Sequence, residues 1–175
     1  YTKITFIPDM ARFEYVGSNN YSMLTDIVRT RAVYASIYLN TIRKNGKVYF
    51  NGELISIKNF DHLIAYTAGA TIIAKDTIIP NLDKTTSTYK YPMSVYVLTG
   101  ININISLVNG IVVPNGKHIE YVCEHIIKEV VTRVSSKLKG AKITPSNVNN
   151  WTLMINCQIP NPPWPGQRKD ALMVD

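Results

Sequence analysis

The chain has 175 residues and a mass of 19.7 kDa, which is enough for one ordinary domain or two small ones. A hydrophobic content of 46% and a charged content of 18% are typical of globular proteins and argue against an intrinsically disordered chain. The apolar runs are too short for a membrane span, and the first residues lack the basic and apolar regions of a signal peptide. The net charge of +7 and the pI of about 9.4 favour an anionic partner, with DNA or RNA ahead of a membrane surface.

The first third of the chain carries strand and helix signals in turn. Residues 3–7 alternate and are β-branched, which predicts a strand that ends at Pro8. Asn19 and Asn20 can cap a helix that begins near Tyr21. Apolar and aromatic residues then recur at close to helical spacing, namely Leu24, Ile27, Val28, Tyr34, Ala35, Tyr38 and Leu39.

A hairpin signal follows. Asn51 and Gly52 both tolerate the positive φ of a tight turn, so the flanking residues 47–50 and 53–56 are predicted to pair as antiparallel strands. A short helix is predicted over residues 59–68, with its first residue as the cap.

A polar, turn-prone patch at residues 80–87 separates the first third from the rest of the chain. Strands are predicted over residues 88–98 and 101–108, with a turn at Thr99 and Gly100. The alternation along the second strand places Ile101, Ile103 and Ile105 on one face and Asn102, Asn104 and Ser106 on the other.

The longest helix is predicted to begin near His118, to run to about Lys139 and to stop at Gly140. The apolar run at residues 151–159 predicts the last strand, a buried one. The predicted helix has an apolar side with Ile119, Val122, Ile126, Val130 and Val134, and a basic side with Lys128 and Arg133.

Cys123 and Cys157 lie inside apolar segments, which favours buried, reduced thiols of an intracellular protein over a disulfide. These cysteines and the three histidines show no metal-ligand spacing, so we expect no structural zinc. The sequence also lacks a G-x-S-x-G motif, a Walker loop and paired carboxylates, so we do not expect the chain to be a complete enzyme.

The segment 161–172 is too rich in Pro and Gly to be helix or strand, and it presents Gln167 and Lys169 two residues apart. A lysine on such a loop is a point charge suited to a terminal phosphate, and a neighbouring glutamine can donate to a phosphate oxygen. The alternative is a solvated surface turn, since lysines are usually exposed.

With its flanks, this segment resembles the Q-x-K loop of type II DNA topoisomerases. The usual Q-T-K-E of that family stands here as Gln-Arg-Lys-Asp at 167–170. Further segments match family motifs in the expected order. The first is 1–6 together with Pro8, Asp9 and Phe13, and the others are 106–111, 115–119, 148–151 and 155–157. The resemblance covers nearly the whole chain.

The resemblance implies an α/β (α+β) fold of two parts. Residues 1–68 would be the C-terminal part of a GHKL-type ATPase domain, and 69–175 a transducer domain, truncated at its C-terminus. The transducer domain is a β-sheet with helices on one face and a left-handed β-α-β crossover, an exception to the usual right-handed rule. Because Tyr1 is not an initiator residue and Asp175 follows a loop without a helix or cap, we expect an internal fragment of a larger protein.

The resemblance also implies roles for residues. Lys169 would be the catalytic lysine that reaches the ATP γ-phosphate, supported by Gln167, while Mg²⁺ would be held by residues outside the chain. Thr2 matches a threonine near the adenine end of the pocket, although an ordinary strand residue is an equal alternative. Arg168 replaces the usual threonine, and we interpret it as a solvent-facing or interfacial side chain. His118 is expected to make a structural hydrogen bond.

Basic residues gather where the predicted long helix ends, and these are Arg133, Lys137, Lys139 and Lys142. In the family this place holds a lysine-rich loop that contacts DNA, and such phosphate contacts carry affinity without sequence information. The alternative is a solvated helix end, where the helix dipole favours cations.

The resemblance implies an ATP-dependent enzyme that passes one DNA duplex through a transient double-strand break. The chain would couple ATP binding and hydrolysis to movement of the N-gate, in a homodimer acting on double-stranded DNA without a membrane. Another GHKL ATPase, of mismatch-repair or chaperone type, and a non-enzymatic nucleic-acid-binding module are the alternatives. The loop form at 166–170 resembles enzymes of large double-stranded DNA viruses. We therefore expect the nucleus for a cellular protein, and a cytoplasmic viral factory or the virion for a viral one.

Overall fold

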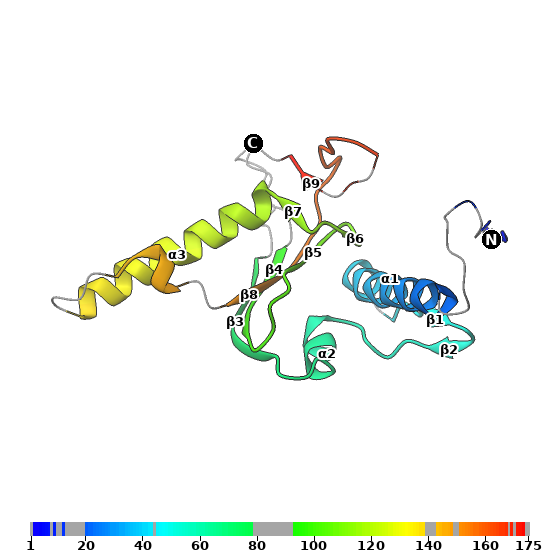
Figure 1. Ribbon diagram of the computed structural model, residues 1–175, viewed down its shortest axis with the longest axis horizontal. Coiled ribbons are helices and arrows are strands. Elements are labelled where there is room, and N and C mark those ends of the chain that lie inside the picture. The colour runs from blue at the N-terminus through cyan, green and yellow to red at the C-terminus, as the bar shows by residue number, and fades with distance from the viewer. Residues whose placement is uncertain are drawn as a thin grey trace.

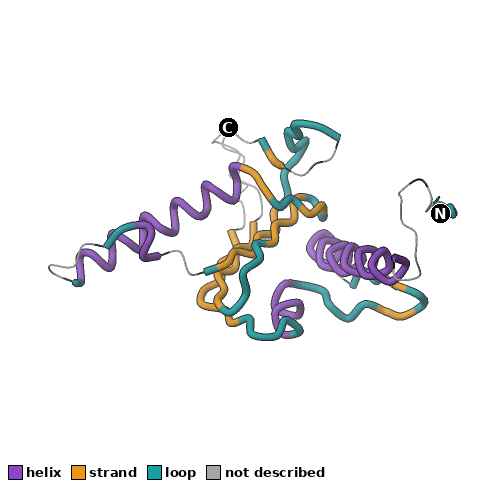
Figure 2. Tube along the Cα trace, in the orientation of Figure 1, coloured by secondary structure: helices purple, strands orange, loops and turns teal. Residues whose placement is uncertain are grey.

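The computed structural model describes residues 2–7, 9, 12, 20–43, 45–78, 93–138, 143–148, 151–167, 169 and 171–173. Its elements form a mixed α/β fold around one central sheet (Figures 1 and 2). None of the described helices is long and apolar enough to cross a membrane. The elements are α1 (Asn20–Ile42), β1 (Tyr49–Phe50), β2 (Glu53–Leu54), α2 (Phe60–Ala65), β3 (Thr71–Ile78), β4 (Met93–Thr99), β5 (Ile105–Val108), β6 (Ile111–Val112), β7 (Asn115–Gly116), α3 (Lys117–Lys137), a 3-10 helix (Pro145–Val148), β8 (Thr152–Cys157) and β9 (Ala171–Leu172).

The sheet has five strands in the order β3-β4-β8-β5-β6. Strand β8 lies at its centre, and every residue of β8 is buried. It pairs antiparallel with β4 and parallel with β5. The chain passes from β5 to the parallel strand β8 through α3, so the β-α-β crossover that the resemblance implied is present. The left-handed sense of this crossover stays a prediction.

Helices cover both faces of the sheet. Strand β8 alternates, with Leu153 and Ile155 packing in one cluster and Met154 in another. The first cluster includes Ile119 of α3, and the second includes Ile37 of α1 together with residues of α2. Figure 1 accordingly shows α3 on one side of the sheet and α1 and α2 on the other. The segment 20–65 thus covers the face that α3 leaves open, which the sequence did not predict.

Several local predictions are confirmed. The hairpin β1–β2 turns at Asn51 and Gly52, whose φ values are 50° and 82°. Asn59 caps α2, because its side chain accepts a hydrogen bond from the backbone N–H of His62 at 2.8 Å. Helix α3 has the predicted apolar and basic sides, but it is not the longest helix, since α1 has 23 residues and α3 has 21. The expected stop at Gly140 and the polar patch at 80–87 lie outside the described residues.

The predicted strand at residues 3–7 is wrong. Residues 2–7 form no strand, and the side chains of Ile4, Phe6 and Ile7 are 82%, 76% and 95% exposed. A strand needs a neighbour for its backbone hydrogen bonds, and none of the described strands pairs with this segment. The alternating pattern of residues 3–7 therefore did not suffice to predict a strand, because no described strand pairs with them.

The sequence did not predict β3 and β6 of the central sheet, nor β7 and β9, which pair with each other in a separate two-stranded sheet. Because β9 follows β8, the strand expected to be the last is not the last. Strands β4 and β5 do not pair with each other, since β8 lies between them. Long-range pairing decides these features, and local patterns do not report it.

The predicted alternation at residues 101–106 is confirmed only in part, since Ile101 and Ile105 pack against one cluster and Ser106 contacts His118 on the other face. Residues 101–104 are irregular, and the strand begins only at Ile105. As a result, Ile103 is 69% exposed, whereas Ser106 is fully buried. A hydrogen bond between the Ser106 hydroxyl and the His118 ring satisfies this buried group.

Candidate functional site

The segment between β8 and β9 is a loop, as predicted, and its described residues belong to no helix or strand. Gln167 is exposed near its tip, while Lys169 is half-buried. Lys169 adopts a positive φ of 54°, and its backbone N–H donates to the carbonyl of Gly166 at 3.4 Å. The hydrogen bond from Lys169 to Gly166 closes a tight turn of the backbone at the place where Gln167 and Lys169 stand in the chain.

Asn109 holds the start of the loop. Its side-chain carbonyl accepts the backbone N–H of Ile159 at 2.9 Å, and its side-chain amide donates to the carbonyl of Ile159 at 2.7 Å. The backbone N–H of Asn109 also donates to the carbonyl of Cys157 at 3.0 Å. These bonds join the turn between β5 and β6 to the residues that leave β8.

The far end of the loop is held by β9, which pairs parallel with β7. The N–H of Met173 donates to the carbonyl of Pro163 at 3.1 Å, which ties the exit of the loop to its beginning. Trp164 packs against the buried cluster of Val108, Val113, Cys157, Ile159 and Leu172. The loop that carries Lys169 is therefore fixed at both ends and packed in the middle.

His118 lies next to this region, in the first turn of α3. Its Nε2 is 2.7 Å from the hydroxyl oxygen of Ser106, so the predicted structural hydrogen bond is confirmed. Burial lowers the pKa of His118 to about 4, and the imidazole is therefore neutral at physiological pH.

The two cysteines are unpaired, as predicted. Cys157 is buried in β8, and burial raises the pKa of its thiol to about 12. Burial is also the main cause that raises the pKa of the Cys123 thiol, with Glu120 and Glu124 adding to it. Both groups stay protonated at neutral pH, which makes them poor nucleophiles. Within the described residues, no group of three or more His, Cys, Asp or Glu side chains could hold a metal ion.

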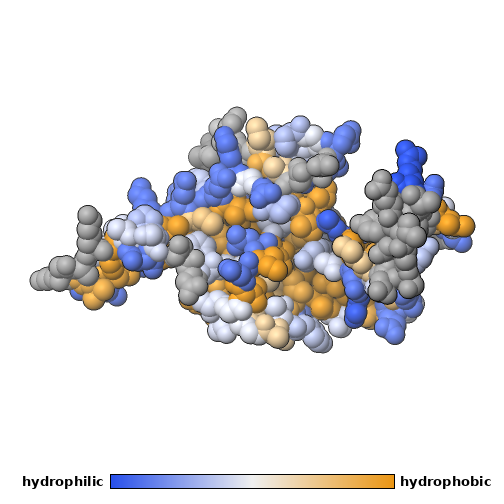
Figure 3. Space-filling model, viewed as in Figure 1, coloured by the Kyte–Doolittle hydropathy of each residue, from blue (hydrophilic) through white to orange (hydrophobic). Residues whose placement is uncertain are grey.

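The predicted basic cluster is only partly described. Arg133 and Lys137 are exposed near the end of α3, whereas Lys139 and Lys142 lie outside the described residues. The Arg133 guanidinium is 2.6 Å from the carboxylate of Glu129, so part of its charge is compensated. Helix α3 extends away from the sheet in Figure 1, and hydrophilic residues recur along its length in Figure 3.

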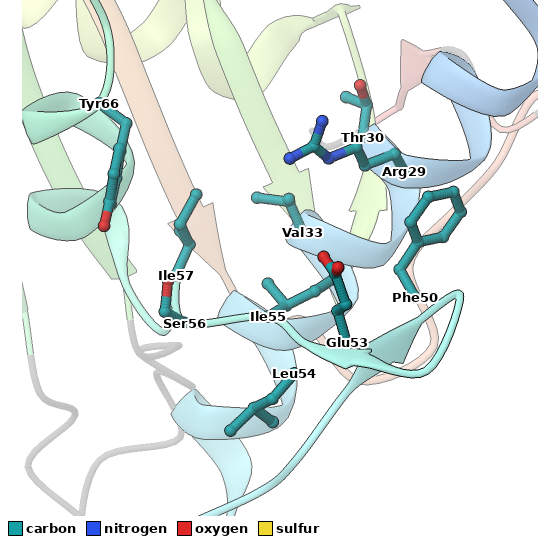
Figure 4. A pocket seen from close by; sticks show the side chains of 10 residues that line it. All are labelled: Arg29, Thr30, Val33, Phe50, Glu53, Leu54, Ile55, Ser56, Ile57 and Tyr66. Atoms are coloured by element: carbon teal, nitrogen blue, oxygen red, sulfur yellow. The ribbon is translucent and has the colours of Figure 1, made fainter. Parts of the chain in front are cut away.

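A cavity of about 380 Å³ lies elsewhere, between α1, the β1–β2 hairpin and Tyr66 (Figure 4). Its lining is mainly apolar, with Arg29 and Glu53 as its charged side chains. None of the predicted phosphate-binding or DNA-binding residues lines this cavity. Thr2 also lies apart from Lys169, because its exposed segment is at the end of the molecule beyond α1, away from β9 (Figure 1).

Known proteins resemble the chain over nearly its whole length. DNA topoisomerase 2 of Meyerozyma guilliermondii is 30% identical over 189 residues, which cover 98% of this chain and 13% of that protein. DNA topoisomerase 2 of Candida albicans is 32% identical over 190 residues, which cover 98% of this chain and 12% of that protein. The chain is related to the type II DNA topoisomerases. No family model matches it.

Solved structures place the fold in the same group. The ATPase region of Saccharomyces cerevisiae topoisomerase II superposes with a TM-score of 0.64 at 22% identity, covering 95% of this chain and 40% of that one. The ATPase and transducer domains of topoisomerase II from Balamuthia mandrillaris give a TM-score of 0.61 at 23% identity, covering 84% and 35%. The chain thus has the fold of part of a type II topoisomerase ATPase region.

Three of the segments through which the chain resembles type II topoisomerases meet at the base of the Lys169 loop. Segment 106–111 contains Asn109, segment 115–119 contains β7, and 155–157 is the end of β8. The sequence predicted the loop and its lysine but no role for Asn109 or Gly116, which hold the loop's two ends. The Asn109–Gly110 pair between two apolar stretches is a turn signal in the sequence that could have drawn attention to Asn109.

Proposed function

We propose that the chain is part of an ATP-dependent type II DNA topoisomerase, in which it couples ATP binding and hydrolysis to movement of the N-gate. The observation that carries this proposal is the attachment of the Lys169 loop at both ends, through Asn109 at Ile159 and through β7 at β9. A force on Lys169 would reach the centre of the sheet through these contacts, because the loop begins directly after β8.

Lys169 would act by a population shift. It gains a strong contact only when a γ-phosphate is present, so hydrolysis removes the contact and releases the loop. Gln167 would donate to the same phosphate. ATP and Mg²⁺ would be bound mainly by residues outside this chain, with Thr2 at the adenine end. Arg168 is proposed to face solvent or an interface.

The two proposed parts, 1–68 and 69–175, share a hydrophobic core in this structure. Ile37 of α1 and Ile64 of α2 pack in one cluster with Leu98 of β4 and Met154 of β8. Such a cluster is a continuous physical path between the proposed ATPase part and the sheet. Movement of one part would therefore bias the position of the other.

Double-stranded DNA is the proposed substrate, and a homodimer formed through the ATPase region is the proposed assembly. Arg133, Lys137, Lys139 and Lys142 would contact DNA phosphates at the end of α3. The net charge of +7 is consistent with such a partner. The proposed location is the nucleus for a cellular protein and a viral factory or the virion for a viral one.

The test is Lys169→Ala in the full-length protein, with ATP turnover and DNA cleavage measured separately. Removal of one group that stabilises charge in a transition state commonly lowers the rate by about 10²–10³. We expect such a loss of ATP turnover with DNA cleavage largely intact. Lys58→Ala is the control, because Lys58 is exposed and lies on the segment between β2 and α2. Unchanged ATP turnover in Lys169→Ala would refute the role of this lysine.

A further inference from the structure

The ring of His118 is satisfied on one side only. Its Nε2 lies 2.7 Å from the Ser106 hydroxyl, whereas its buried Nδ1 has no hydrogen-bond partner among the described residues. Buried polar atoms are nearly always paired, so an unpaired one calls for a physical explanation.

The surroundings of Nδ1 point to strand β9. Gly116 has a φ of 140° and no side chain. A Cβ at Gly116 would stand 2.9 Å from Nδ1 of His118, and 2.8 Å and 2.9 Å from the backbone N and O of Leu172. Nδ1 and the backbone N and O atoms of Leu172 therefore border the same small space, which stays open because residue 116 is glycine.

The Ser106 hydroxyl can pair with Nε2 of either neutral tautomer of His118, because a hydroxyl both donates and accepts. The imidazole is neutral, since burial lowers the pKa of His118 to about 4, and a neutral ring has one N–H. When the Ser106 hydroxyl donates to Nε2, the ring proton is on Nδ1, beside the space that the Leu172 carbonyl oxygen also borders. That carbonyl has two lone pairs, so it can accept this proton while β9 stays paired with β7.

We propose that His118 is a positioning residue for Lys169, and that its Nδ1–H donates to the Leu172 carbonyl when Lys169 contacts the γ-phosphate. Leu172 follows Lys169 by three residues, so a small shift of β9 toward α3 moves the lysine and closes this hydrogen bond together. The bond would join the Lys169 loop to the start of α3, the helix that covers one face of the sheet. This inference rests on the proposed function of Lys169.

Two substitutions of His118 test the roles of its two ring nitrogens one at a time. His118→Asn places an amide near the position of Nδ1 but does not reach Ser106. His118→Gln places its amide near the position of Nε2, so it keeps the Ser106 contact and leaves the space beside Leu172 unfilled. In the full-length protein we expect ATP turnover of His118→Gln to fall about tenfold, the effect of one hydrogen bond, while His118→Asn stays within about twofold of wild type.

A purely structural role of the Ser106 contact predicts the opposite order, with His118→Gln the more active variant. The inference would be overturned if His118→Gln had the higher ATP turnover. It would also be overturned if both variants lost turnover equally, or if both kept wild-type turnover. The ratio of affinities for a non-hydrolysable ATP analogue and ADP gives a second readout. It should fall toward one in His118→Gln and be retained in His118→Asn, which a loss of stability alone would not produce.

Lys169→Ala, measured alongside, separates this inference from the proposed function. Unchanged turnover in Lys169→Ala contradicts the proposed function itself. A large loss in Lys169→Ala with wild-type turnover in His118→Gln contradicts the role of His118 alone. Ser106→Ala keeps the ring and removes only the hydroxyl that contacts Nε2, so this variant replaces His118→Gln as the test if His118→Gln does not fold. We expect a loss of about two- to fivefold for Ser106→Ala, and wild-type turnover there would also overturn the inference.

Discussion

The side chain of Asn109 forms two hydrogen bonds with the backbone of Ile159, which lies fifty residues later in the chain. The amide thus acts as a short piece of strand at the point where β8 has ended and the Lys169 loop begins. Ile159 is 9% exposed, so its backbone groups have little access to water as an alternative partner. Asn109 also adopts a φ of 51°, a conformation that asparagine tolerates better than most residues.

Asn109→Ala is predicted to destabilise the ATPase region by about 2–4 kcal/mol, because two buried backbone groups lose their partners. Urea denaturation at neutral pH measures this change in the free energy of unfolding. ATP turnover should fall as well, since the Lys169 loop loses its attachment to β5.

Asn109→Gly is the matched control, because glycine accepts the positive φ but makes neither side-chain bond. If the hydrogen bonds matter more than the backbone conformation, Asn109→Gly will lose nearly as much stability as Asn109→Ala. Wild-type stability in Asn109→Gly would contradict the role of these bonds.

Local patterns predicted those parts of the fold that depend on neighbouring residues. The Asn51–Gly52 turn, the Asn59 cap and the apolar side of α3 each follow from residues a few positions apart. The strand predicted at 3–7 is wrong because a strand also needs a distant pairing partner. Its local pattern is typical of a strand, but no described strand pairs with it. The central position of β8 between β4 and β5 depends on contacts between residues at least 49 positions apart, which no local pattern encodes.

The candidate site shows the same division. Gln167 and Lys169 stood out because of the resemblance and the loop composition, and the structure places both on that loop. The two hydrogen bonds between Asn109 and Ile159 could not be predicted from the sequence. They depend on the end of β8 lying beside the β5–β6 turn, which only the folded structure shows. Ser106 lies on the face opposite Ile105, as predicted, but its burial could not be predicted, because its partner His118 lies on another element.

Gly100→Ala is predicted to be strongly destabilising. A Cβ at Gly100 would stand 1.7 Å from the carbonyl oxygen of Gly69, so the two backbone segments would have to separate. Gly52 provides a control with nearly the same φ, 82° against 83°, and no atom within 4 Å of its Cβ position. Gly52→Ala should lose only the conformational cost of about 1–2 kcal/mol, and Gly100→Ala clearly more. Equal losses in thermal denaturation would contradict the close approach of Gly69 and Gly100.

Asp61 of α2 is predicted to contribute a small acid-sensitive stabilisation. Its carboxylate is 2.7 Å from Lys75 of β3 and accepts the hydroxyl of Tyr96 at 3.1 Å. The hydrogen bond from Lys75 is the main cause that lowers the pKa of Asp61 below its ordinary 3.8. A lowered carboxylate pKa stabilises the fold above about pH 4, and this contribution is lost as the pH falls through the folded-state value.

The pair is well exposed, with side chains 54% and 40% accessible, so we expect only about 0.2–1 kcal/mol. In Asp61→Asn, the difference in unfolding free energy between pH 7 and pH 3 should shrink by that amount. Asp26→Asn on the exposed surface of α1 is the control. An unchanged difference in Asp61→Asn, or an equal change in both variants, would rule out the contribution of this ion pair.

The basic end of α3 is predicted to affect DNA binding and not nucleotide binding. Replacing Lys137, Lys139 and Lys142 by Glu removes three potential phosphate contacts and adds repulsion. DNA-stimulated ATP turnover should fall while basal turnover persists. The slope of DNA affinity against salt should also flatten, by up to about 0.9 for each lost contact, since fewer counterions are released.

The matched control for that triple variant is Arg43→Glu with Lys47→Glu and Lys58→Glu, which changes the net charge equally at exposed positions away from α3. The measurement is the DNA affinity of the ATPase region across a salt series for wild type and both variants. A local contact at the end of α3 predicts a flatter slope only for the first variant, whereas a general effect of net charge predicts the same change in both. If slope and affinity are unchanged in the first variant, the cluster is a solvated helix end whose cations are explained by the helix dipole alone.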